Sequence, residues 1–306
     1  MAWELTPLLK ASKTYSDRHQ ILSNARIHEH ISFSDVVTRH TQHGNLKNAV
    51  RVYLQKPEFD SFCSLLSLLK GCAMVRDLVI GRELHDYIIC SGFEHDLYIG
   101  SSLVDFYVKC TSILDARNVF NKMPNRNVVS WNALLAGYVD NVLNENIVCL
   151  FHQMQLEGVA PDVITYVNLL KAFQFMKDIN MGREVHDKIV ICGLEHDMFV
   201  GSSIVSMYTK CGLLSDAWDV FKKLTTRDAV LWTALISGFA EHGGCKEALK
   251  HIETMKHDNL TPTAHLYACI LKCCSTLKMA DKGREIHAEV TKKGFDADLY
   301  VGTSLV

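Results

Sequence analysis

The sequence predicts an all-α protein built as a solenoid of tandem helical hairpins. The chain repeats itself at a fixed spacing, and inside each repeat the apolar residues recur at intervals of three and four, as on one face of a helix. Prolines, which interrupt helices, number only 5 in 306 residues. No stretch shows the alternating apolar and polar pattern of a strand.

The fixed spacing is 101 residues. Three motifs return with this spacing. The first stands at 81–85, 182–186 and 283–287, and the second at 92–104, 193–205 and 294–306. The third stands at 130–134 and 231–235. The second of them reads Gly-Phe-Glu-His-Asp-Leu-Tyr-Ile-Gly-Ser-Ser-Leu-Val in its first copy. Because three motifs share one register, chance similarity is excluded, and each repeat is expected to bury its apolar face on the next.

Each block of 101 residues divides into units of 35, 35 and 31 residues. The units are placed at 30–61, 62–96, 97–127, 128–162, 163–197, 198–228, 229–263 and 264–298, with an incomplete unit at 299–306. Residues 1–29 fit a transit peptide or a degenerate earlier repeat about equally well. Because the last unit stops after eight residues, the chain is expected to be a fragment or a truncated gene product.

Each unit is expected to form two helices. In 229–263 the first helix carries Trp232, Leu235 and Phe239 on one face, and Gly243-Gly244 separates it from the second. The twentieth residue of a unit is small almost everywhere, which predicts a close approach of neighbouring helices: Ala49, Gly81, Ala116, Gly182, Ala217, Ala248 and Gly283. Ile147 is the exception and predicts a looser contact.

Composition excludes several function classes. A hydrophobic content of 48% suffices for a packed core. The sequence contains no run of 18 apolar residues, so it predicts no membrane span. The net charge of −2 argues against a duplex-coating protein, which gains most of its affinity from neutralised phosphates, so no DNA partner is expected. The 11 cysteines include no Cys-x-x-Cys pair, so the sequence predicts no metal site, no cofactor and a reducing compartment.

One segment imitates a catalytic motif. His287-Ala-Glu289 matches half of a zinc deaminase signature, but no Pro-Cys-x-x-Cys follows it. His287 also recurs with the repeat as His85 and His186, and Cys110 recurs as Cys211. A catalytic residue is not expected to recur with a structural repeat, so we predict no catalytic residues and no enzyme.

The alternation of unit lengths resembles the PLS subclass of plant pentatricopeptide repeat proteins over residues 30–306, whereas a tetratricopeptide array would keep 34 residues throughout. The motifs that carry the resemblance are Val128-Val-Ser-Trp-Asn132 with Gly158-Val-Ala-Pro-Asp162 of a P unit, Gly182-Arg-Glu-Val-His186 of an L unit, and Met207-Tyr-Thr-Lys-Cys-Gly212 of an S unit. The resemblance assigns the P type to units 30–61, 128–162 and 229–263. It assigns the L type to units 62–96, 163–197 and 264–298, and the S type to units 97–127, 198–228 and 299–306. The chain itself lacks the E/DYW extension of the subclass. The resemblance implies a right-handed superhelix that binds single-stranded RNA, one base per repeat.

In this family the fifth and the last residue of a unit discriminate the base. The pairs that the resemblance assigns are Ser101 with Asn127 for adenine, Asn132 with Asp162 for uracil, Ser202 with Asp228 for guanine, and Thr233 with Thr263 for a weak purine preference. Thr303 begins an incomplete pair, and Ser34 with Ser61 lies in the shortened first unit. The L units carry apolar Leu66, Val167 and Ala268 at the fifth position and are expected to discriminate little. The implied RNA is 5′-N-N-A-U-N-G-R-N-R-3′.

The family also uses the second residue of a unit as a wedge against the base. The residues at this position are Ile31, Cys63, Tyr98, Val129, Ile164, Phe199, Val230, His265 and Tyr300. The fourth residues, Trp131, Tyr166, Trp232 and Tyr267, are expected in the core. Asp96, Asp197 and Asp298 stand where an N-cap belongs, so a structural role stays open for them, as it does for Asp162 and Asp228. Asn168, a sixth residue, is expected to face away from RNA.

The resemblance implies a specificity factor for C-to-U editing or processing of single-stranded organellar RNA. Such a factor would guide a separate editing deaminase or accessory editing factors, in the mitochondrion or alternatively in the chloroplast. Two other classes stay open. One is a protein-interaction scaffold, which the near-neutral charge suggests, and the other is an editing enzyme whose deaminase end is missing from this chain.

Overall fold

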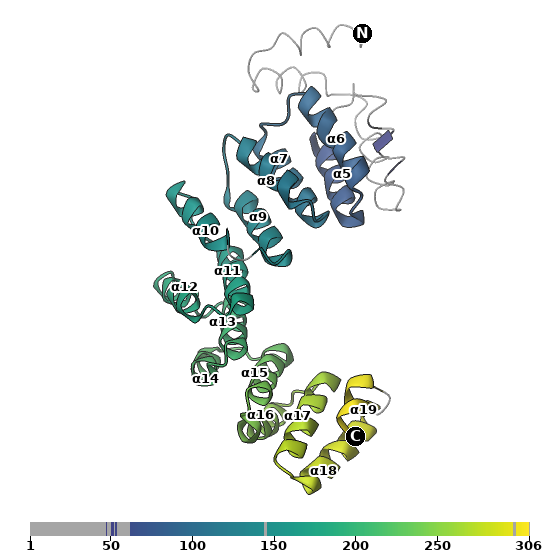
Figure 1. The fold of residues 1–306 in the computed structure, drawn as a ribbon, viewed down its shortest axis with the longest axis vertical. Helices are drawn as coiled ribbons and strands as arrows, with labels where there is room; N and C mark the ends of the chain where they lie inside the picture. The colour runs from purple at the N-terminus through teal and green to yellow at the C-terminus, as the bar shows by residue number, and fades with distance from the viewer. Residues whose placement is uncertain are drawn as a thin grey trace. The chain divides into compact units, whose positions relative to one another are not determined.

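The computed structural model describes residues 47, 50, 51, 53, 62–143, 146–295 and 298–305 (Figure 1). The regular structure of these residues is entirely helical, which confirms the predicted all-α class. The segment 1–29 and most of unit 30–61, with Ile31, Ser34, Ala49 and Ser61, lie outside the described residues. Within the described ranges, no helix combines the length and the apolar character needed to cross a bilayer.

The helices follow one another in pairs separated by short connections. They are α5 (Phe62–Val75), α6 (Leu78–Cys90), α7 (Leu97–Lys109), α8 (Ile113–Lys122), α9 (Val128–Asp140), α10 (Ile147–Leu156), α11 (Val163–Met176), α12 (Ile179–Ile191), α13 (Met198–Lys210), α14 (Leu214–Lys223), α15 (Ala229–Glu241), α16 (Cys245–His257), α17 (Ala264–Thr276), α18 (Ala280–Lys292) and α19 (Leu299–Leu305). The odd-numbered helices begin at the first residues of the predicted units from 62 onward. We call them first helices, and the even-numbered ones second helices.

The described residues form two compact units divided between Gly137 and Tyr138. Within the first, α5 packs on α7, and each of them contacts its own second helix. Within the second, α11, α13, α15, α17 and α19 pack on one another in sequence, and α12, α14, α16 and α18 pack against the first helices. Each hairpin therefore buries its apolar face on the next hairpin of its own unit, as expected for helical repeats.

Glycine at the twentieth position permits a close helix approach at two of its three occurrences. A Cβ atom on Gly81 would lie 1.9 Å from Cζ of Phe106, and one on Gly182 would lie 2.8 Å from Sδ of Met207. Both partners belong to the first helix of the following unit. At Gly283 the nearest atom would be Cβ of Cys274 at 3.8 Å, so there the glycine is not required by space. Ile147 is fully buried, and the looser contact expected there stays a prediction.

The fourth residue is a core aromatic in the units that begin at 128, 163, 229 and 264. Trp131, Tyr166, Trp232 and Tyr267 are all buried, which confirms their predicted place. The ring of Trp131 meets Phe120 edge-on at 4.6 Å between centroids, and Trp232 meets Phe221 in the same way at 4.5 Å. Aromatic pairs of this geometry stabilise a core beyond their buried area. The same contact therefore recurs in two copies of the repeat.

His251 on α16 is a buried titratable group in this core. Its ring lies 4.2 Å from Trp218 and 5.0 Å from Phe239, between centroids. Burial, and after it the charge of Lys250, lowers the pKa of His251, against an opposing effect of Glu247. The folded state therefore favours the neutral ring.

We expect His251 to make stability depend on pH. Because its pKa is lower in the folded chain than in the unfolded chain, the unfolded state takes up the proton first as pH falls below about 6.5. The stabilisation is complete above that pH and is lost as pH falls through the folded pKa. Urea titrations from pH 7.5 to 5 should show a smaller loss of unfolding free energy in His251→Phe than in wild type. The exposed His257→Phe should behave as wild type, and identical pH profiles for all three proteins would contradict the assignment.

Candidate nucleic-acid interface

The second residue of each first helix is exposed although it is apolar or aromatic. Side-chain exposure is 64% at Tyr98, 58% at Ile164 and 74% at Val230, and Val129 and Phe199 lie between these values. Cys63 and His265 are exposed as well, while the side chain of Tyr300 lies outside the described residues. A first helix thus offers an apolar side chain at its N-terminal end, where a flat base could stack.

The last residue of each unit caps the first helix that follows. The side chain of Asp96 accepts hydrogen bonds from the backbone N–H of Tyr98 and Ile99, and Asp197 does the same for Phe199 and Val200. Asp298 accepts from Val301 N–H at 3.3 Å. The N-cap role expected for these three residues is therefore confirmed.

The proposed base-reading residues at the same position are helix caps too. Asp162 forms a capping box with Thr165, and Asp228 accepts from Leu231 N–H through Oδ1 at 2.8 Å. Asn127 accepts from Ser130 N–H at 2.9 Å through its amide oxygen. Thr263 accepts from Leu266 N–H at 3.3 Å. A cap holds the side chain at the helix N-terminus in a fixed orientation, so structural and recognition roles are compatible in one residue.

The fifth residues bearing hydroxyl groups bond back to their own helix. Ser101 donates to the carbonyl oxygen of Leu97 at 2.7 Å, and Thr233 donates to that of Ala229 at 2.6 Å. Ser202 donates likewise to Met198. A hydroxyl that donates internally keeps acceptor capacity. Ser101 is only 7% exposed.

The fifth residues of the remaining units are an amide, three apolar side chains and a threonine. Asn132 on α9 is only 7% exposed, and its amide carries both donors and an acceptor. Leu66 and Val167 are half-buried, and Ala268 is buried. These three apolar side chains cannot form a hydrogen bond to a base. Thr303 is exposed on the short helix α19.

Ser202 and Asp228 lie on neighbouring elements of one compact unit. Ser202 belongs to α13, Asp228 caps α15, and the two helices pack directly on one another. A base lying across the N-terminal ends of these helices would meet the fifth residue of one and the cap of the next. Sequence spacing alone, an offset of 26 residues, does not show that the helices which carry these two residues pack together.

The orientation of Asn168 away from RNA stays a prediction. Asn168 lies four residues after the exposed Ile164 and three before Lys171 on α11, and such spacings place residues on the same helix face. Its Nδ2 atom is buried and has no hydrogen-bond partner in the described part of the chain.

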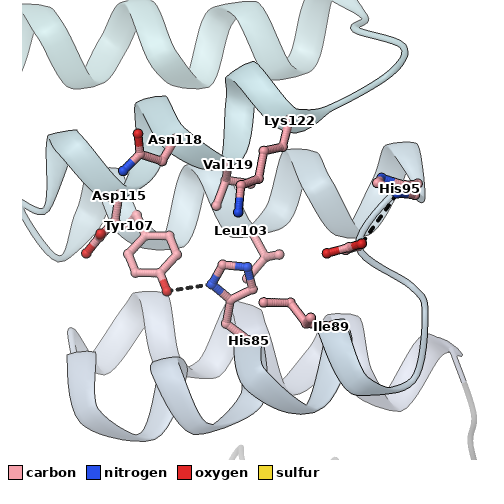
Figure 2. Close-up of a pocket in the computed structure, with 10 residues that line it drawn as sticks. His85, Ile89, His95, Leu103, Tyr107, Asp115, Asn118, Val119 and Lys122 are labelled. Carbon is pink, nitrogen blue, oxygen red and sulfur yellow. Dashed lines mark hydrogen bonds and ion pairs between the residues drawn. The ribbon is translucent and has the colours of Figure 1, made fainter.

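A pocket of about 190 Å³ is lined by residues of α6, α7 and α8 and by Glu94 and His95, which precede the cap of α7 (Figure 2). His85 Nδ1 lies 2.7 Å from the hydroxyl of Tyr107, and Arg82 pairs with Asp115 at 2.8 Å. The same contacts recur 101 residues later between His186 and Tyr208 and between Arg183 and Asp216. This recurrence indicates a structural role for the histidines, as predicted.

Burial favours the neutral forms of His85 and Tyr107 in this pocket. Burial lowers the pKa of His85, and burial together with the charge of Asp115 raises the pKa of Tyr107 to about 12. Burial also raises the pKa of Cys110 and Cys211, which makes both thiols less reactive. No set of three His, Cys, Asp or Glu side chains among the described residues is placed to hold a metal ion.

Glu289 in the deaminase-like segment is engaged in structural contacts. It accepts from the hydroxyl of Tyr267 at 2.7 Å and pairs with Lys256. Burial alone would raise the pKa of Glu289, but the hydrogen bonds from Lys256 and Tyr267 lower it. An ionised carboxylate held in this way is poorly suited to act as a general acid.

Family models match two parts of the chain. The PPR repeat family matches residues 126–174, a PPR repeat matches 202–228, and the pentatricopeptide repeat domain matches 220–276. Together they cover first helices whose caps and exposed second residues are described above.

Two plant proteins are similar in sequence to most of this chain. A chloroplastic pentatricopeptide repeat-containing protein of Arabidopsis thaliana is 32% identical over 279 residues, which is 90% of this chain and 34% of the relative. A mitochondrial one from the same plant is 34% identical over 240 residues, 78% of this chain and 38% of the relative. The chain thus spans about a third of the length of the curated relatives it matches.

The fold is similar to that of the pentatricopeptide repeat protein PPR10, crystallised in complex with an 18-nt psaJ RNA element. The TM-score is 0.75 at 19% sequence identity, and the match covers 97% of this chain and 46% of the other. A likeness at this identity shows the fold alone. The matched repeats, the relatives and the all-helical hairpin fold agree: this chain is a pentatricopeptide repeat protein of plant type.

Proposed function

We propose that this chain binds single-stranded RNA in a sequence-specific manner, one base per repeat. The observation that carries the proposal is the apolar second residue, exposed on one first helix after another and adjacent to a polar cap. An exposed apolar side chain costs free energy unless something covers it, and a stacked base is a suitable cover. The fold likeness to PPR10, a protein crystallised with an RNA element, supports the same choice.

Recognition would combine stacking with hydrogen bonds at the base edge. The second residue stacks on the base, whereas the fifth residue and the cap of the next helix test its Watson–Crick edge. The proposed pairs are Ser101 with Asn127 for adenine, Asn132 with Asp162 for uracil, and Ser202 with Asp228 for guanine. Thr233 with Thr263, and Thr303, would contribute a weaker purine preference.

The cellular role that we propose is that of a specificity factor for organellar RNA. It would direct C-to-U editing or processing, with an editing deaminase or accessory factors as partners, as the resemblance to the PLS subclass implies. The matched relatives include both chloroplastic and mitochondrial proteins, so an organelle is supported and either one is compatible. An editing factor that continues beyond this chain into a deaminase is compatible with the same RNA-binding repeats.

A protein-interaction scaffold is a second candidate, and one observation favours it. Several second helices carry large apolar side chains that are mostly exposed, among them Leu114 on α8, Leu156 on α10 and Ile191 on α12. Exposed apolar residues are common at protein interfaces, although single scattered ones need no partner. Failure of the chain to bind any RNA from a randomised single-stranded pool would favour this candidate.

Asp228→Asn tests the proposed function. The asparagine oxygen can replace Oδ1 of Asp228 as the cap of α15, so stability should stay near that of wild type. The new pair, Ser202 with asparagine, resembles the pair Ser101 with Asn127. We therefore expect the preference at the sixth nucleotide to change from guanine to adenine in a competition assay with four RNAs that differ only there.

The matched control is Asp197→Asn. Asp197 caps α13 in the same way, but the fifth residue of its unit is the apolar Val167. This substitution should leave base preference unchanged at every nucleotide. If Asp228→Asn and Asp197→Asn give the same pattern, or if wild type binds duplex and single-stranded RNA equally, base reading by these residues is excluded.

A further inference from the structure

The first helices carry charged residues on the same face as the exposed second residues. Residues 2, 6, 9 and 13 of a first helix are spaced by four, three and four, which keeps them on one narrow face of an α-helix. On α13 these residues are Phe199, Ser203, Ser206 and Lys210. We call this face the first-helix stripe. A single strand that stacks on the second residues must pass its phosphates near these side chains.

Two lysines on the stripe are held by carboxylates of a neighbouring first helix, whereas Lys109 pairs with Asp105 of its own helix. Lys171 Nζ on α11 lies 2.7 Å from Asp140 Oδ1 on α9, and Lys210 Nζ on α13 lies 2.9 Å from Glu241 Oε2 on α15. Asp140 and Glu241 are both the thirteenth residue of their helices and the last residue of α9 and α15. The acidic residue therefore recurs with the 101-residue repeat, whereas its lysine lies on the following first helix for Asp140 and on the preceding one for Glu241.

These ion pairs are open to solvent. The side chains of Lys210 and Glu241 are 46% and 44% exposed, and those of Lys171 and Asp140 are 47% and 59% exposed. Ion pairs at such exposure are weak, because water solvates both partners and salt screens them. A phosphate that approaches the stripe can therefore replace the carboxylate as the partner of the lysine.

We propose that Asp140 and Glu241 compete with RNA phosphates for the lysines of the first-helix stripe. This inference rests on the proposed RNA binding. In the free chain the carboxylates neutralise Lys171 and Lys210. In the complex each lysine turns to a phosphate, and the released carboxylate repels the same phosphate. The competition lowers the contribution of charge to affinity, so binding depends more on stacking and base contacts. Its effect is independent of base sequence.

Glu241→Gln tests the competition. The amide cannot hold Lys210 by charge and does not repel phosphate, so the affinity for single-stranded RNA should rise about threefold to tenfold at low salt. The gain should be the same for matched and mismatched RNAs and should shrink as salt is raised. Filter binding of the full chain at several salt concentrations measures both effects. Lys210→Gln should lower the affinity.

Glu184→Gln is the control for loss of one negative charge. Glu184 pairs with Lys188 at 2.8 Å on the second helix α12 and is 49% exposed, close to the value for Glu241. Glu184→Gln should leave the affinity for single-stranded RNA nearly unchanged. If wild type binds RNA and Glu241→Gln binds no tighter than Glu184→Gln, the competition is rejected while RNA binding stands. If wild type binds no single-stranded RNA, both the competition and the proposed function are rejected.

Discussion

Replacing Trp232 with alanine is expected to lower the free energy of unfolding by about 3–5 kcal/mol, the usual cost of removing a large aromatic side chain from a core. The indole is buried and meets the ring of Phe221 at 4.5 Å between centroids. Its Nε1 has no hydrogen-bond partner among the described residues, so the loss is one of packing. Urea unfolding followed by circular dichroism measures the change.

Val230→Ala is the control, two residues earlier on the same helix. Val230 is 74% exposed, so its truncation should change the free energy of unfolding by less than about 0.5 kcal/mol. It should instead weaken RNA binding, because it removes the proposed stacking surface of unit 229–263. Equal destabilisation by the two substitutions would show that the second residue belongs to the core. In a repeat array neighbouring hairpins can unfold separately, so the transition around α15 should show the largest shift.

Asn132→Thr is expected to weaken the binding of RNA that has uracil at the fourth nucleotide by about 1–3 kcal/mol, as for the loss of one base-edge contact. The amide of Asn132 offers a donor and an acceptor, which suit O4 and N3–H of uracil. Thr233, the equivalent threonine on α15, donates its hydroxyl to Ala229 and keeps only acceptor capacity. A threonine at 132 should behave likewise and suit the N–H groups of guanine. Guanine should then be preferred at that nucleotide.

The measurement is a competition among four RNAs that differ only at the fourth nucleotide. Asn168 is a weaker control, because helical spacing places it near the face of Ile164 on α11. Asn121→Thr is better matched, since Asn121 is exposed on the second helix α8. It should leave all four affinities unchanged, and the preferences assigned to Ser101 and Ser202 should persist in both variants. If Asn132→Thr lowers all four affinities equally, the residue supports the fold and does not read the base.

Much of the fold follows from short-range patterns in the sequence. The spacing of Trp232, Leu235 and Phe239 defines a helix face, and burial of these residues agrees with it. The helical caps could be located for a similar reason. The side chain of an Asp immediately before an apolar periodic segment can accept hydrogen bonds from backbone N–H groups in the first turn that follows, and Asp96, Asp197 and Asp298 all do so.

Contacts between residues far apart in the chain needed the tertiary structure. Helical periodicity places Lys210 on a face, but only the packing of α13 on α15 brings Glu241 within 2.9 Å of it. In the same way, Gly182 faces the side chain of Met207, whereas the repeat-equivalent Gly283 has no close neighbour. Sequence determined the local elements, since they depend on neighbours a few residues apart. Structure decided the partners across helices, because these depend on how separate hairpins pack.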